Sequence, residues 1–174
     1  MFVLGVDPGL SRCGYGCIES GVGHGRPVAV GVLTTPPSRP LPDRLGELDR
    51  EFRALLGELR PDAVAVERVF FQVNARTAMS VGQASGLVLA AAAQAGCDVA
   101  QYTPNEVKQA VAGYGAAPKD QVQRMVRTLL ALAEPPRPPD AADALALALC
   151  HLAMAPLRAT VARVAGSASI GNTQ

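Results

Sequence analysis

The chain has 174 residues, of which 49% are hydrophobic and 18% charged, with a formal net charge of +1. This balance is typical of one globular domain and excludes an intrinsically disordered chain. The most apolar stretch, residues 86–95, is about half the length that a membrane-spanning helix needs. The N-terminus also lacks the pattern of a secretory signal, so we expect a cytoplasmic protein without a membrane segment.

The N-terminal half predicts three strands, followed by alternating helices and strands. Residues 2–6, 12–19 and 27–34 have the apolar and β-branched composition of strands. After a proline-rich loop, the leucine spacing over 43–59 predicts an amphipathic helix that ends before Pro61. Residues 63–66 predict a buried strand ending at Glu67, and Asn74 is expected to cap a helix that runs to about Gln94.

The C-terminal half predicts one more strand, over 98–102, and three helices. Thr103, Pro104 and Glu106 have the pattern of a helix start with a capping box. A second helix is expected from Pro118 to about residue 132, and a third over 140–154. The tail loses its apolar pattern after Pro156, so we expect a single domain over 1–155 and a flexible tail over 156–174. The order of elements predicts an α/β fold with a mixed five-stranded sheet flanked by helices.

Four acidic residues stand at the ends of these predicted elements. Asp7 ends the first strand and Glu67 the fourth, while Asp140 and Asp143 begin the last helix on one face. Open α/β sheets bind ligands beyond the carboxyl ends of their strands, so the four carboxylates could converge. Such a cluster suits Mg²⁺, and two ions can hold the attacking water and the leaving oxygen of a phosphodiester.

Each of these acidic residues also has a purely structural explanation. Asp7 before Pro-Gly is a common way to open a turn, and Glu67 could pair with Arg68 at the surface. Asp140 and Asp143 could simply cap and begin a helix. The four positions together favour a metal site over these separate explanations. The scattered cysteines and two histidines make a zinc site unexpected.

Six strings, in order over residues 4 to about 155, resemble the RuvC family of bacterial Holliday-junction resolvases. The strings are Leu4-Gly-Val-Asp-Pro-Gly9 with Gly14-Tyr-Gly16, Val66-Glu-Arg-Val-Phe70, Asn74 with Gly82-Gln-Ala-Ser-Gly86, Val107-Lys-Gln109, Gln121-Val-Gln-Arg-Met-Val-Arg-Thr-Leu-Leu130 and Asp140-Ala-Ala-Asp-Ala-Leu145. The resemblance implies a ribonuclease H-like fold and a homodimeric endonuclease that cuts four-way junction DNA, leaving a 5′-phosphate and a 3′-hydroxyl. It also suggests contact with the RuvA and RuvB branch-migration proteins.

The resemblance further implies which residues act. Asp7, Glu67, Asp140 and Asp143 match the catalytic set, which would bind two Mg²⁺ ions, with Mn²⁺ as a possible substitute. Some relatives carry His at the position of Asp140, and His can also bind a metal.

Aromatic and basic residues supply candidate DNA contacts. Phe70 matches a family phenylalanine that stacks on bases near the crossover, and Lys108 and Lys119 match lysines that contact the junction backbone. Core packing for one phenylalanine and a solvated surface for the lysines remain alternatives. Four further candidates have weaker support: Phe71, Arg76, Arg124 and Arg127.

Small residues recur every four positions on the predicted helix that ends near Gln94. They allow either tight packing on the protein's own sheet or a dimer interface, and the family resemblance favours the interface. These residues are Ala78, Gly82, Gly86 and Ala90. Separately, Gly14, Gly16 and the turn formed by Asp7, Pro8 and Gly9 would suit a close approach of backbone to phosphate.

Three other functions remain open on the sequence. Phosphotransferases of the actin and sugar-kinase type begin with a similar strand, turn and hairpin, but they need a second lobe for which this chain is short. A ribonuclease H-like nuclease acting on another substrate, such as an RNA–DNA hybrid, would use the same carboxylates. A DNA-binding module that no longer cuts is the third, although all four carboxylates are present.

Overall fold

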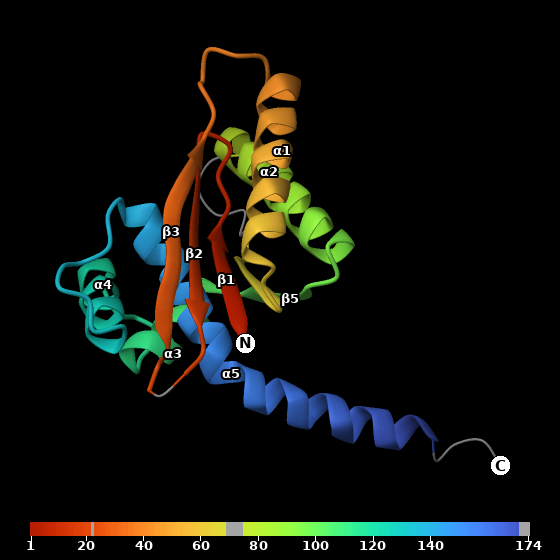
Figure 1. Ribbon diagram of the computed structural model, residues 1–174, viewed down its shortest axis with the longest axis vertical. Coiled ribbons are helices and arrows are strands. Elements are labelled where there is room, and N and C mark those ends of the chain that lie inside the picture. The colour runs from red at the N-terminus through yellow and green to blue at the C-terminus, as the bar shows by residue number, and fades with distance from the viewer. Residues whose placement is uncertain (22, 69–74, 171–174) are drawn as a thin grey trace.

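The computed structural model describes the backbone of residues 1–21, 23–68 and 75–170, and the side chains of these residues except 75–77, 157–159 and 161–170. Within these described residues, five strands form one sheet, and five helices cover it (Figure 1). The strands are β1 (Phe2–Asp7), β2 (Arg12–Glu19), β3 (Arg26–Thr34), β4 (Ala63–Glu67) and β5 (Asp98–Tyr102). The helices are α1 (Leu41–Leu59), α2 (Ala75–Gln94), α3 (Pro104–Ala112), α4 (Lys119–Leu129) and α5 (Pro139–Ile170).

The sheet is mixed, as the order of elements predicts. Its strand order is β3-β2-β1-β4-β5. The β1–β2 and β2–β3 pairs are antiparallel, whereas β1–β4 and β4–β5 are parallel. Because β1 and β4 are parallel neighbours in the middle of the sheet, their carboxyl ends lie side by side. This arrangement is what brings residues 7 and 67 together.

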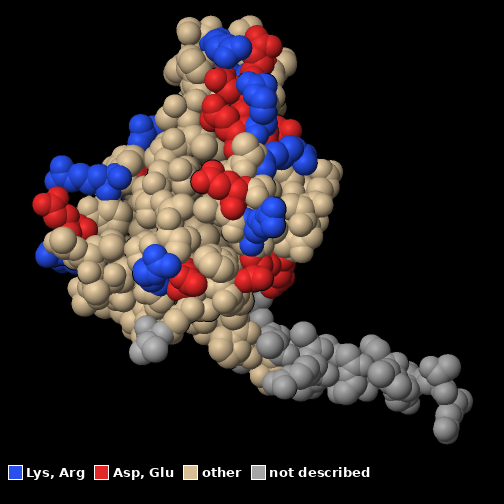
Figure 2. All heavy atoms as spheres, viewed as in Figure 1, with Lys and Arg blue, Asp and Glu red and all other residues tan. Residues whose placement is uncertain are grey.

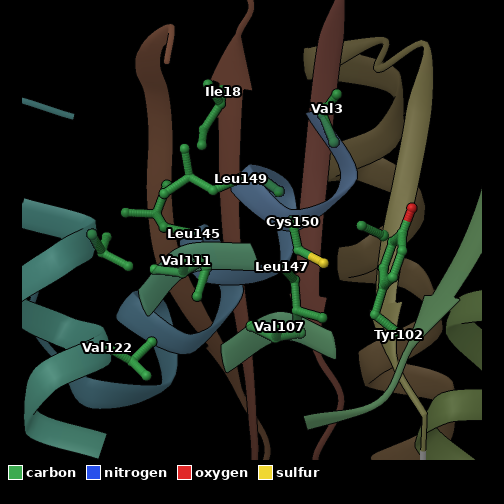
Figure 3. Close-up of a cluster of buried hydrophobic side chains, with 14 of the residues drawn as sticks. Val3, Ile18, Tyr102, Val107, Val111, Val122, Leu145, Leu147, Leu149 and Cys150 are labelled. Atoms are coloured by element: carbon green, nitrogen blue, oxygen red, sulfur yellow. The ribbon is translucent and has the colours of Figure 1, made fainter. Parts of the chain in front are cut away.

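Helices pack on both faces of the sheet and bury a separate apolar layer on each. On one face, α1 and α2 cover alternate strand residues such as Leu4, Val6 and Val64. On the other face, α3, α4 and α5 cover the residues between them, including Val3 and Ile18. Figure 3 shows this second layer, in which α5 lies between the sheet and the two shorter helices. The central strands are apolar on both faces because both are covered, whereas the edge strand β3 contains no fully buried residue.

Glycines set how closely α5 approaches the sheet. A Cβ atom on Gly5 of β1 would overlap the carbonyl oxygen of Ala144, and one on Gly14 of β2 would overlap that of Asp140. A Cβ atom on Gly16 of β2 would likewise overlap the side chain of Leu145. The interpretation of Gly14 and Gly16 as a phosphate approach is therefore wrong, because the start of α5 already occupies that space. The contact places Asp140 and Asp143 directly beside the end of β1.

Most element boundaries agree with the sequence prediction, and one differs by a large margin. The capping box at Thr103 is present, with reciprocal hydrogen bonds of 2.7 and 3.2 Å between Thr103 and Glu106. The last helix, expected to end at Met154, instead continues through Pro156 to Ile170. A proline removes only its own N–H bond and constrains the preceding turn, so the alanine- and valine-containing sequence after Pro156 can remain helical. In Figure 1 this part of α5 extends away from the sheet.

The charge distribution on the visible surface is mixed. In Figure 2, acidic and basic side chains alternate over α1, as the composition of residues 43–60 suggests. Two of the pairs that involve this helix are Arg39–Glu47 and Arg53–Asp49. None of the helices in the described ranges is long and apolar enough to cross a membrane.

Candidate active site

The site begins with two carboxylates on neighbouring strands. Asp7 and Glu67 directly follow Val6 and Val66, which are register partners in the parallel β1–β4 pair. Both side chains are partly buried at the rim of the sheet. Glu67 does not pair with Arg68 in the ion pairs that the structure describes, so the surface ion pair is not the reason for this glutamate.

The N-terminal end of α5 supplies the other two carboxylates, Asp140 and Asp143. Asp143 lies with Asp7, Glu67, Lys108 and Lys119 around one cavity of about 360 Å³. Asp140 is not among the residues that line this cavity, although its charge still acts on Asp7. The apolar remainder of the cavity wall comes from α3, α4 and α5, through residues such as Val107, Val122 and Leu147.

Burial and mutual repulsion raise the pKa of the strand-end carboxylates. The pKa of Asp7 is raised to about 7, first by burial and then by the charges of Glu67, Asp143 and Asp140. Burial and Asp143 also raise the pKa of Glu67, while Lys119 and Lys108 oppose that change. Carboxylates held together at this cost are typical of a functional site, and a bound cation would relieve the repulsion.

Two cations neutralise the carboxylates on α5. The Nζ atom of Lys119 donates to Oδ2 of Asp143 at 2.6 Å, and this hydrogen bond raises the pKa of Lys119. Arg12 donates from Nε and Nη2 to Oδ2 of Asp140 at 2.9 and 2.8 Å. The sequence did not single out Arg12, because its partner lies 128 residues away.

The donor set suits a hard divalent cation, which prefers oxygen ligands. Within the described residues, however, no three His, Cys, Asp or Glu side chains are arranged to hold a metal ion as they stand. Asp140 and Asp143 are each paired with a cationic side chain in this arrangement. The structure therefore brings the carboxylates together with their charges partly compensated by Arg12 and Lys119.

Of the remaining candidate DNA-contact residues that the structure describes, only some lie at this cavity. Lys108 is half-buried on α3 and lines the cavity. Arg124 is exposed but pairs with Asp120 at 2.6 Å, and Arg127 donates to the carbonyl of Leu132 at 3.3 Å. Phe70, Phe71 and the side chain of Arg76, like the proposed cap Asn74, lie outside the described residues.

The small residues of α2 face open space. A Cβ atom on Gly82 or Gly86 would meet no described atom within 4 Å. Gly86 and Ala90 are exposed, and Met79 beside them is 66% exposed. Packing on the protein's own sheet is therefore not the reason for these two glycines, since Ala84, Val88 and their neighbours form the buried face of α2 instead.

Comparison with known proteins decides the family. The family model described as "Crossover junction endodeoxyribonuclease RuvC" matches residues 3–151. The chain belongs to the RuvC family. Its relatives include the crossover junction endodeoxyribonuclease RuvC of Moorella thermoacetica, 50% identical over 95% of this chain and 99% of the relative. The corresponding protein of Salinispora arenicola is 55% identical over 98% of both chains.

Solved structures agree with this assignment and with the ribonuclease H-like fold. A structure of Thermus thermophilus RuvC matches with a TM-score of 0.83 and 42% identity, covering 90% of this chain and 96% of that one. The same organism's RuvC in complex with a Holliday junction substrate matches with a TM-score of 0.85 and 43% identity, with the same coverage. A yeast mitochondrial Holliday junction resolvase shares the fold at 14% identity, with a TM-score of 0.60.

Proposed function

We propose that this chain resolves Holliday junctions by metal-dependent hydrolysis of phosphodiesters in opposing strands, during recombination and DNA repair. The observation that carries the proposal is the cavity at the end of β1 and β4, in which Asp7, Glu67, Asp143 and Lys119 meet. The relative from Thermus thermophilus, whose title names a Holliday junction substrate, supports the choice of DNA. An RNA–DNA hybrid would fit the carboxylates equally well, but the relatives described above are named as crossover junction endodeoxyribonucleases.

The carboxylates would hold the metal ions in this proposal. Asp7, Glu67, Asp140 and Asp143 offer only oxygen donors, so we infer two Mg²⁺ ions, with Mn²⁺ as a substitute. When bound, such a pair supplies the positive charge that favours ionised water and stabilises the leaving 3′ oxygen. The pKa values of Asp7 and Glu67 are raised when no cation is bound, so a bound cation would stabilise the ionised forms of these two carboxylates.

Lys119 has a separate role in the same cavity. Its ammonium group donates to Asp143 and is surrounded by carboxylates, which raise its pKa and keep it protonated. A protonated amine at this position can donate a hydrogen bond to a non-bridging oxygen of the scissile phosphate. Lys108, which lines the same cavity, would contact the backbone through charge alone.

The remaining DNA contacts follow the family resemblance. Phe70 or Phe71 would stack on bases near the crossover, which contributes about 1–3 kcal/mol per base in single-strand binders. Arg76, Arg124 and Arg127 would contact phosphates further from the cut. For Arg124 this requires competition with its partner Asp120, so we expect a smaller effect there.

A homodimer would place two such sites on one junction. The open face of α2 around Gly82 and Gly86 allows close approach of a second copy, with Ala78 and Ala90 on the same stripe. A two-fold axis would then direct identical sites to strands of like polarity. We also infer a nuclease domain over 1–155, a cytoplasmic location and contact with RuvA and RuvB from the same resemblance.

The proposal is tested by separating binding from cutting. Asp7→Asn should abolish cleavage of a synthetic four-way junction in Mg²⁺ while binding in chelator stays within about threefold of the wild type. Glu58→Gln, an exposed carboxylate on α1, is the matched control and should cut normally. Full cutting by Asp7→Asn would remove the carboxylate site, and loss of both binding and cutting would point to a folding defect instead.

A further inference from the structure

A second cavity, of about 290 Å³, opens beside the turn that follows Asp7. It is lined by residues 9–12 of that turn, by Arg44 on α1, and by Ser80 and Val81 on α2. The carboxylate cavity has Asp7 in its wall, so the two cavities adjoin the same short segment of chain. Any group held in the second cavity would therefore lie close to the reacting centre.

Arg44 is fixed in place by neutral partners. Its Nη2 atom donates to Oγ of Ser11 at 2.6 Å, and its Nε atom donates to Oγ1 of Thr35 at 3.0 Å. Thr35 is only 3% exposed and donates in turn to the carbonyl oxygen of Leu10. None of the ion pairs in the described residues includes Arg44. The guanidinium is thus held by two hydrogen bonds beside an open cavity, and none of the described ion pairs compensates its charge.

Arg12 connects this cavity to the catalytic carboxylates. It lines the second cavity while both its Nε and Nη2 atoms donate to Asp140. Its side chain remains 49% exposed, so a further ligand can reach it. Arg44 also lies in the first turn of α1, where the helix dipole adds to the attraction of an anion.

We propose that Ser11, Arg12 and Arg44 form a subsite for a backbone phosphate of the DNA strand that passes the catalytic carboxylates. The inference rests on the proposed function, since it assigns this second cavity to the same substrate. The Nη1 atom of Arg44 takes part in neither of the hydrogen bonds to Ser11 and Thr35, so it can donate to a phosphate oxygen, and an arginine already held by these residues loses little side-chain entropy on binding. The subsite fixes the register of the strand and carries no base specificity.

The test measures how junction binding depends on salt. Each phosphate contact that is lost makes the slope of log K against log salt shallower by about one. In chelator, where the junction stays intact, Arg44→Gln should show this change and bind several-fold more weakly at low salt. Arg44→Lys should restore most of the slope, because it keeps the charge. Arg53→Gln, on the same helix but outside the cavity, is the control and should keep the wild-type slope.

A purely structural role for Arg44 gives a different pattern. Thr35→Val removes one of the hydrogen bonds that hold Arg44 but keeps its charge. If Arg44→Gln and Thr35→Val lower the melting temperature alike and neither changes the salt slope, the subsite is refuted. Inorganic phosphate that stabilises the wild type but not Arg44→Gln, with an unchanged slope, would assign the cavity to a free anion and also overturn the proposal.

Failure of the phosphate subsite and failure of the proposed junction resolution give different results. A wild type that binds a junction no better than a linear duplex of the same sequence would contradict junction resolution. The change in salt slope of Arg44→Gln, measured on the duplex, would still decide whether the cavity holds a backbone phosphate.

Discussion

Replacing Asp7 with asparagine should stabilise the metal-free protein, and the gain should grow as the pH rises. In the folded protein the pKa of Asp7 is about 7, compared with an ordinary value of 3.8. Between these two values the folded chain keeps a proton that the unfolded chain has released. Stability therefore falls as the pH rises through this range, and the cost is complete above about pH 7.

The size of the effect follows from the same two pKa values. Their difference corresponds to roughly 4 kcal/mol above pH 7, and to roughly 2 kcal/mol at pH 5. For a domain of this size, 1 kcal/mol changes the melting temperature by about 2–4 °C. Asparagine keeps the shape of the side chain but cannot ionise, so Asp7→Asn should escape this cost.

Thermal unfolding in chelator at pH 5 and pH 8 measures the effect. The advantage of Asp7→Asn over the wild type should be several degrees larger at pH 8. Asp43→Asn, an exposed aspartate on α1, should show no such growth. Saturating Mg²⁺ should narrow the gap at pH 8, because a bound cation relieves the repulsion only in the wild type. A gap that is equal at both pH values, or smaller at pH 8, would contradict a raised pKa of Asp7 in the folded protein.

Three further predictions concern the DNA contacts and the dimer. Lys119→Ala should slow junction cutting about 10- to 100-fold. It should also move the acidic limb of the pH–rate profile to higher pH, because Lys119 lowers the pKa of Asp7 and Glu67. Lys119→Arg should keep the acidic limb in place, and an unmoved limb in Lys119→Ala would contradict the electrostatic role. Phe70→Ala should reduce junction cutting while metal binding, followed by calorimetry, stays intact; unchanged cutting kinetics would remove the stacking role. Gly86→Leu should weaken dimerisation, measured by sedimentation, at least tenfold. Gly57→Leu on α1, which also faces open space, should not weaken it. An unchanged dimer in Gly86→Leu would contradict a dimer interface on α2.

The sequence predicted the fold well because its local signals agree with its long-range packing. Apolar runs of five or six residues, bounded by Asp-Pro-Gly or by proline, give the strands nearly to the residue. The capping box at Thr103 is a local chemical signal, and it appears as expected. The end of α5 was predicted wrongly, because Pro156 is a local signal for the end of a helix and the helix continues past it.

The candidate site was predicted in part. Residues at strand ends, such as Asp7 and Glu67, could be placed together because the parallel pairing of their strands follows from the order of elements. Arg12 and Arg44 could not be found in this way. Their partners, Asp140, Ser11 and Thr35, meet them only through the packing of α5 and α1 on the sheet. The glycines at 14 and 16 were misread because the helix that fills the space beside them comes from the far end of the chain.

Cleavage of two DNA substrates tests whether the carboxylate site cuts four-way junctions. A synthetic four-way junction and a linear duplex of the same sequence are incubated with Mg²⁺, with Mn²⁺ and with chelator. We expect paired nicks in opposing strands, only in the junction and only with metal. Equal cutting of both substrates would contradict junction specificity, and tight junction binding without cutting under either metal would contradict the assignment of Asp7, Glu67, Asp140 and Asp143 as a catalytic site.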